Sequence, residues 1–210
     1  MKEYFILKSK KKLLFISILF SLLINGCHPG YIVPGEVDVI SKSPMSVHFR
    51  CANLVIFPFN TSENSPDLSS DVAKLFSQEI SRHNHVNKIT LIEDTSVFSN
   101  IEKEELRIQK ALYIANSLEA DMIMIGSIDY YFDSVSIDTK AIVSTMIISV
   151  ASGKKLWWGT KPTTGKTGKK SFLIGDHMTP DPPTAQELLL HTVEQIVFSI
   201  FYTKTYYQDT

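Results

Sequence analysis

The glycine- and lysine-rich stretch at residues 159–167 is the part of this 210-residue chain that first suggests chemistry, because Gly-Lys-Thr after an earlier glycine is typical of phosphate-binding loops. Such a loop has four residues between its first glycine and the Gly-Lys-Thr, and a helix begins directly after it. Here five residues separate Gly159 from Gly165, and no clear helix start follows Thr167. The sequence therefore predicts no nucleotide site and no other cofactor.

Histidines could bind a metal or act as a base, but their spacing favours neither role. His83 and His85 stand two residues apart at the end of a predicted helix, so they do not share a face, and no third ligand lies nearby in sequence. A favourable charge at the helix C-terminus is the better interpretation. His191 falls beside leucines of the last predicted helix, and no Gly-x-Ser-x-Gly turn presents a nucleophile. We therefore expect that the protein is not an enzyme and that it has no catalytic, cofactor-binding or metal-binding residues.

Cys27 is the residue for which the sequence predicts a covalent modification. Five lysines and then an apolar run of 12 residues, 13–24, precede it, and Asn25 and Gly26 stand directly before it. The segment resembles the bacterial lipobox, which implies cleavage after Gly26 and acylation of Cys27 that is sufficient for stable anchoring. The apolar run is shorter than the roughly 20 residues of a membrane span. An uncleaved signal anchor, oriented by the lysines, is the alternative.

Cleavage would leave a mature chain with 16 basic and 21 acidic residues. This balance carries no general basic bias, so we do not expect nucleic acid as a partner. Cys51 would be the only thiol left, which excludes an internal disulfide framework and a cysteine metal site.

The chain divides into three parts on composition. Residues 1–26 are the predicted lipoprotein signal peptide, and residues 27–50 comprise the lipidated cysteine and a flexible tether that is rich in proline and glycine and has no helical period. Residues 51–210 are long enough for a single periplasmic-type α/β domain with one core.

Alternating apolar strands and amphipathic helices predict the fold class of this domain. Continuous apolar runs at residues 53–59 and 122–128, and a shorter one at 88–92, are typical of buried strands. A helix is predicted to end at residues 83–85, and a second helical region precedes the strand at 122–128. On the apolar side of that second region we expect Leu106, Ala111, Ile114, Ala115 and Leu118. This order favours a three-layer mixed β-sheet covered by helices.

The remainder predicts a long antiparallel hairpin at residues 137–160, with Gly153 in its turn, before a C-terminal helix at about 184–202. We expect residues 162–170 to form a loop between them. Two sets of residues in this region are candidate interaction sites. They are the adjacent Trp157 and Trp158, which must point to opposite faces of a strand, and the basic residues Lys161, Lys166, Lys169 and Lys170. A solvated loop is the simpler interpretation of the lysines, and a contact with anionic lipid, cell-wall polymer or an acidic protein face is the alternative.

Three short segments resemble a family of envelope proteins. They are the strand at 54–59, which ends in Pro-Phe, the segment 118–126, which has Ala-Asp near its start and ends in Gly, and the segment 150–157, in which a Gly turn precedes Leu-Trp. These segments are similar to a domain that three proteins share: the curli-secretion lipoprotein, the penicillin-binding-protein activator lipoprotein and, as its N-terminal domain, the Tol propeller protein. The resemblance covers about residues 50–202. The hairpin at 137–160 lacks an apolar face of spanning length, so pore formation is not expected.

The resemblance and the predicted anchor together imply a non-enzymatic interaction module in, or accessory to, an envelope or secretion assembly. Its expected partners are a membrane, through the lipid, and another envelope protein, and a homo-oligomer stays open. His28 follows Cys27 where an inner-membrane retention signal would have Asp, which favours the outer membrane facing the periplasm. A lipoprotein that binds cell wall or a small ligand is the alternative function.

Overall fold

The computed structural model describes residues 31–34, 38–39, 52–61, 68–99, 101–132, 139–166 and 183–202. The predicted signal peptide, Cys27, Cys51, Lys169 and Lys170 lie outside these residues. Among the described residues, no helix is both long enough and apolar enough to cross a membrane.

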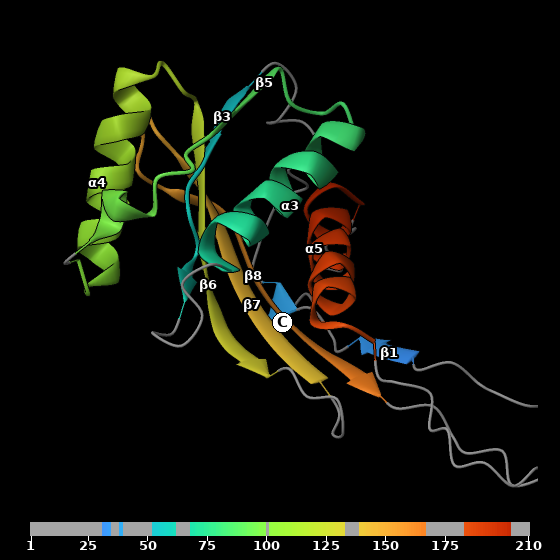
Figure 1. Ribbon diagram of the computed structural model, residues 1–210. Helices are drawn as coiled ribbons and strands as arrows, with labels where there is room; N and C mark the ends of the chain where they lie inside the picture. The colour runs from blue at the N-terminus through green and yellow to red at the C-terminus, as the bar shows by residue number, and fades with distance from the viewer. Residues whose placement is uncertain are drawn as a thin grey trace, which may run out of the picture.

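One mixed sheet forms the middle of the molecule, with strand order β1-β8-β7-β6-β3-β5 (Figure 1). The central strand β3 pairs in parallel with β5 and β6, whereas β6, β7 and β8 form an antiparallel meander. Two short strands complete the sheet, because β2 pairs with β8 and β4 pairs with β6. The strands are β1 (Tyr31–Pro34), β2 (Asp38–Val39), β3 (Asn53–Ile56), β4 (Asn60–Thr61), β5 (Lys88–Leu91), β6 (Met122–Phe132), β7 (Thr139–Ser149) and β8 (Lys155–Lys166).

Helices cover both faces of the sheet, which confirms the predicted three-layer arrangement (Figure 1). Helices α3 (Leu68–Arg82) and α5 (Ala185–Tyr202) pack side by side on one face, and α4 (Glu104–Ser117) packs on the other with the short 3-10 helix η1 (Thr95–Phe98).

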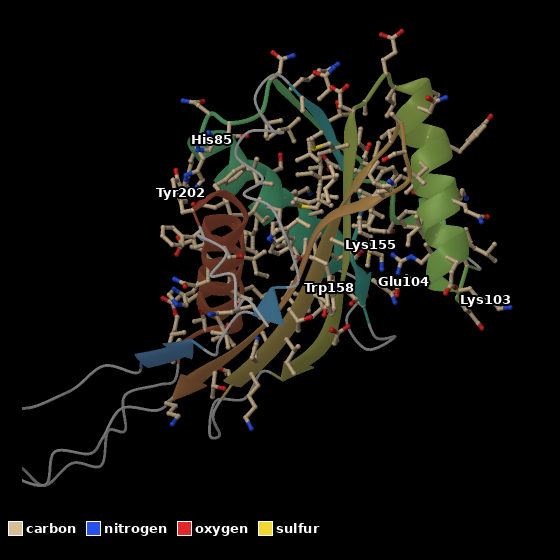
Figure 2. The ribbon with its side chains drawn as sticks, turned by 180° about the vertical axis from the view of Figure 1, so that it is seen from behind. His85, Lys103, Glu104, Lys155, Trp158 and Tyr202 are labelled. Atoms are coloured by element: carbon tan, nitrogen blue, oxygen red, sulfur yellow. The ribbon has the colours of Figure 1, made fainter. Side chains whose placement is uncertain are left out.

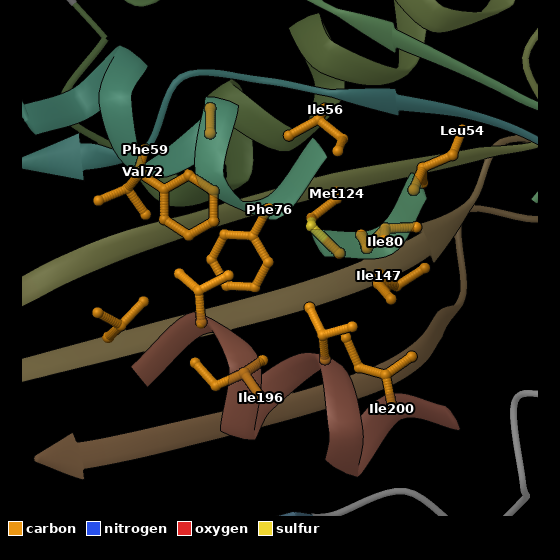
Figure 3. Packing of buried hydrophobic residues seen from close by; sticks show 14 of the residues in the cluster. Leu54, Ile56, Phe59, Val72, Phe76, Ile80, Met124, Ile147, Ile196 and Ile200 are labelled. Atoms are coloured by element: carbon orange, nitrogen blue, oxygen red, sulfur yellow. The ribbon is translucent and has the colours of Figure 1, made fainter. Parts of the chain in front are cut away.

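The larger core lies between the sheet and the α3 and α5 layer (Figure 3). Alternate residues of β3 and β6 point into it, and the rings of Phe59 and Phe76 stack there with centroids 5.0 Å apart. The smaller core, under α4, takes the intervening residues of the same strands, such as Val55 and Ile123. Strands buried on both faces explain why these runs are continuously apolar in the sequence.

Two polar contacts fix the ends of these elements. The Asn53 backbone N–H donates to Asp121 Oδ2 at 2.7 Å, which ties the beginning of β3 to the residue before β6. At the beginning of α5, Thr184 and Glu187 form a reciprocal capping box: Thr184 N–H donates to Glu187 Oε2 at 2.8 Å, and Glu187 N–H donates to Thr184 Oγ1 at 3.2 Å.

The predicted apolar side of α4 is partly wrong. Ala111 and Ala115 are buried as expected and Ile114 packs against the smaller core, but Leu106 is 49% exposed and Leu118 is 43% exposed. The alanines have no bulk beyond Cβ, so α4 lies close to the sheet along a stripe that also contains Ile108 and Leu112. That stripe excludes Leu106 from the core.

The hairpin of β7 and β8 is confirmed, with Gly153 at φ +66° in its turn, but the loop expected from residue 162 is wrong as far as residue 166. Strand β8 continues to Lys166, because β7 pairs with it as far as Gly165 and β1 pairs with it from Thr163 to Lys166. Thr163 lies beneath α5, where its Oγ1 is 2.9 Å from the Thr192 Oγ1. Pro162, which has no N–H to donate, lies between the stretches of β8 that pair with β1 and with β2.

Part of the range expected to be a flexible tether also belongs to the sheet. Tyr31 pairs with Lys166, and Asp38 pairs with Thr160, so β1 and β2 form the outer edge beside β8. Ile32 packs against the larger core. These two strands are therefore part of the folded domain.

Candidate functional site

A pocket of about 520 Å³ lies on the α4 face of the sheet, beside the beginning of α4. Strands β6, β7 and β8 supply its floor, and the beginning of α4 supplies one wall (Figure 2). Its volume is within the range of small-molecule sites. The residues that line it are Asn60, Phe98, Glu102, Glu104, Arg107, Ile125, Gly126, Ser127, Asp129, Ser144, Met146, Lys155 and Trp158.

The polar floor of the pocket is a hydrogen-bonded chain that crosses three strands. Ser127 Oγ on β6 donates to Asp129 Oδ1 at 2.5 Å, and Ser144 Oγ on β7 donates to Asp129 Oδ2. Ser144 Oγ also lies 2.9 Å from Thr160 Oγ1 on β8. The β6 register shifts between Ile128 and Tyr130, beside Asp129. Such an irregularity redirects side chains at sites of this kind.

Apolar and aromatic side chains form the other lining of the pocket. Four of these side chains belong to the smaller core or pack against it: Trp158, Phe98, Ile125 and Met146. The Arg107 guanidinium carbon lies 4.7 Å from the centre of the Phe98 ring, in cation–π contact. Burial of this guanidinium lowers the pKa of Arg107, against the opposing effect of Glu104.

Lys155 and Glu104 face each other at the mouth of the pocket, with Nζ and Oε1 4.0 Å apart (Figure 2). Both side chains are more than half exposed. The pair is therefore screened by water and adds little to stability. Its effect is to place one compensated pair of charges at the rim.

The two adjacent tryptophans point to opposite faces, as a strand requires. Trp157 is buried in the larger core at 2% exposure, and Trp158 is part of the pocket.

The structure does not bring Lys161 and Lys166 together. Lys161 is buried on the face that α5 covers, and Lys166 lies an odd number of residues away on the same strand, so their side chains point to opposite faces. A single basic surface cannot contain both.

His83 and His85 directly follow the C-terminal end of α3, and His85 lies near Tyr202 at the end of α5 (Figure 2). His83 Nδ1 is 3.1 Å from the Tyr202 hydroxyl oxygen, and His83 Nε2 is 3.3 Å from Glu79 Oε1. These contacts join two helices. In the described part of the chain, no group of three or more histidine, cysteine or acidic residues is arranged to hold a metal.

Sequence reasoning missed Ser127, Asp129 and Ser144. One signal was present, because polar residues at positions 127 and 129 continue the alternation of Ile123 and Ile125 on the same face of β6. A strand whose inward positions change from apolar to polar indicates where a covering helix ends.

No family model matches the sequence, and no curated protein matches it. The fold is similar to that of PelC from Paraburkholderia phytofirmans, which was solved as a dodecamer. The TM-score is 0.56 at 14% identity, over 80% of this chain and 99% of that one. Lipoprotein GNA1162 from Neisseria meningitidis gives a TM-score of 0.40 at 14% identity, over 69% of this chain and 97% of that one. The C-terminal domain of LpoB from Escherichia coli gives 0.34 at 14% identity, over 57% and 92%.

Proposed function

We propose that this chain is a lipid-anchored, non-enzymatic interaction module of a bacterial envelope or secretion assembly, and that its α/β domain works as an oligomer. The observation that carries the proposal is a pair of exposed apolar patches on opposite sides of the sheet, one on α4 and one on α5. Large exposed apolar side chains that gather on one face are typical of protein interfaces.

The α4 patch consists of Leu106 and Tyr113, which are 49% and 78% exposed. They are seven residues apart, so they lie two turns from each other on one stripe of the helix. The α5 patch consists of Phe198 and Tyr202, which are 56% and 48% exposed. Their ring centroids are 5.0 Å apart.

Because the two patches lie on opposite faces of the sheet, contact between the α4 patch of one copy and the α5 patch of the next would join copies head to tail. Such heterologous contacts produce closed rings when the rotation closes. PelC, whose fold is similar, forms a dodecamer, and this supports assembly through repeated copies.

Sedimentation velocity of the full chain in detergent tests the self-association. We expect the wild-type chain to sediment as an oligomer, and Tyr113→Glu and Phe198→Glu each to give monomers, because a charge placed in an apolar contact prevents its burial. Gln78→Glu, at an exposed position of α3 that belongs to neither patch, adds the same charge and should leave the oligomer intact.

A mixture of the two patch variants distinguishes head-to-tail contact from a symmetric dimer. Tyr113→Glu keeps an intact α5 patch and Phe198→Glu keeps an intact α4 patch, so the mixture should form a heterodimer with one contact. A wild-type chain that is monomeric at every concentration measured would overturn the oligomeric part of the proposal.

The membrane attachment in this proposal is supported by the sequence around Cys27, and the outer membrane is favoured because His28 follows it. A second candidate function, binding of cell wall or a small ligand by the anchored domain, is supported by the pocket of about 520 Å³.

A further inference from the structure

Two carboxylates of the pocket, Glu102 and Asp129, take part in none of the ion pairs of the described residues, and of the three pocket carboxylates Asp129 is the one on the sheet. Three carboxylates, Glu102, Glu104 and Asp129, line it together with two cations, Arg107 and Lys155. Both cations lie toward α4, where Lys155 faces Glu104 at 4.0 Å and Arg107 lies over the Phe98 ring. Asp129 lies on β6, and none of the ion pairs of the described residues includes it.

The hydroxyl hydrogens around Asp129 already take part in hydrogen bonds within the protein. A hydroxyl has one hydrogen, and those of Ser127 and Ser144 are donated to Asp129. The contact of 2.9 Å between Ser144 Oγ and Thr160 Oγ1 therefore has Thr160 as its donor. What this chain offers to a ligand is lone pairs and a negative charge. A ligand that fits must bring the hydrogen-bond donors.

An aromatic wall stands beside these acceptors. Trp158 and Thr160 are two residues apart on β8, so they share a face at a distance of about 7 Å. Trp158 is partly exposed and lines the pocket together with Met146 and Ile125. Aromatic faces attract cations and also accommodate apolar bodies.

We propose that this pocket binds a compact ligand with a protonated primary amino group, in which the ammonium donates to the Asp129, Ser127 and Ser144 oxygens and the apolar body lies against Trp158. An ammonium carries three donors and a positive charge, which matches a site with acceptors and a net negative charge. This inference names a ligand class for the second candidate function. It does not depend on the oligomer or on the lipid anchor.

Three probes of similar shape test the ammonium: benzylamine, benzyl alcohol and benzoate. We expect titration calorimetry on the full chain in detergent to give the tightest binding for benzylamine, weaker binding for benzyl alcohol and none for benzoate. Added salt should weaken only the binding of benzylamine. The tryptophan fluorescence of the wild type should change on binding, and Trp158→Phe should remove that change, because Trp157 is buried on the other face of the sheet.

Asp129→Asn should weaken the binding of benzylamine about tenfold or more and leave that of benzyl alcohol unchanged, because only the charged hydrogen bonds are lost. Glu105→Gln removes an exposed carboxylate from α4 that does not line the pocket, and it should change neither affinity. Benzyl alcohol that binds as tightly as benzylamine would overturn the ammonium preference and leave a general ligand pocket standing. Failure of both to bind would overturn the ligand class, whereas the cell-wall part of the second candidate function would still stand.

Discussion

Gly126 shows how a single residue shapes both faces of β6. A Cβ at this position would meet the Ser144 carbonyl oxygen and the Phe59 ring, whose Cδ1 atom would be 2.8 Å away. The strand therefore passes between Phe59 in the larger core and the floor of the pocket only because position 126 has no side chain. Position 126 requires glycine because neighbouring atoms lie too close for a side chain. Backbone conformation is not the reason, because φ is not positive at this residue.

Gly126→Ala should lower the free energy of unfolding by about 2 to 3 kcal/mol, because Phe59 and the β7 backbone must move to admit the methyl group. Denaturant unfolding of the full chain measures this. Gly153→Ala is the matched control: nothing lies within 4 Å of its Cβ position, and its φ of +66° alone should cost about 1 kcal/mol. Equal effects of the two substitutions would show that packing at position 126 does not matter.

The capping box of α5 is the clearest local signal at the scale of an element. Thr184→Ala removes the oxygen that accepts the Glu187 N–H, and it should destabilise the protein by about 1 kcal/mol. Thr184→Ser keeps that oxygen and should be close to neutral. Thermal unfolding of the two variants beside the wild type checks this, and a Thr184→Ala variant as stable as Thr184→Ser would contradict a capping role.

The elements that were predicted well are those whose burial follows a simple period. Strand β3 is buried on both faces, and α5 places Leu188, Val193 and Ile196 on one stripe, so both are visible as hydrophobic patterns. The second half of β8 was not predicted as a strand. Its buried face carries glycine, threonine and Lys161, and a hydropathy pattern does not identify such residues as buried. This half of the strand pairs on one side with β7, and on the other with β1, a partner more than 120 residues earlier in the chain.

The candidate site depends on strand register, which the sequence specifies poorly. Ser144 reaches Asp129 only because β6 and β7 pair with Ser127 opposite Ser144. A register shifted by one residue would move Ser144 to the other face. The adjacent Trp157 was enough to propose Trp158 as a candidate interaction residue. The hydrogen-bonded chain of Ser127, Asp129, Ser144 and Thr160 could be recognised only in the folded sheet.

At the scale of the whole molecule, the proposed attachment to a membrane depends on Cys27. We expect mass spectrometry of the chain from its native membrane to show a mature N-terminus at Cys27 carrying fatty acid, and Cys27→Ala to carry none and to incorporate no labelled fatty acid. Cys51→Ala is the control, since it removes the other cysteine and should not affect labelling. A chain that keeps Met1 and takes up no label would contradict the anchor.

The pairing of Tyr31 with Lys166 limits where such an anchor could lie. Cys27 is four residues before Tyr31, and four residues of chain reach at most about 14 Å. An acylated Cys27 would therefore keep Tyr31 within that distance of residue 27, and with it the Lys166 end of β8 that pairs with Tyr31. The domain would then be attached at one corner of its sheet, close to the membrane surface.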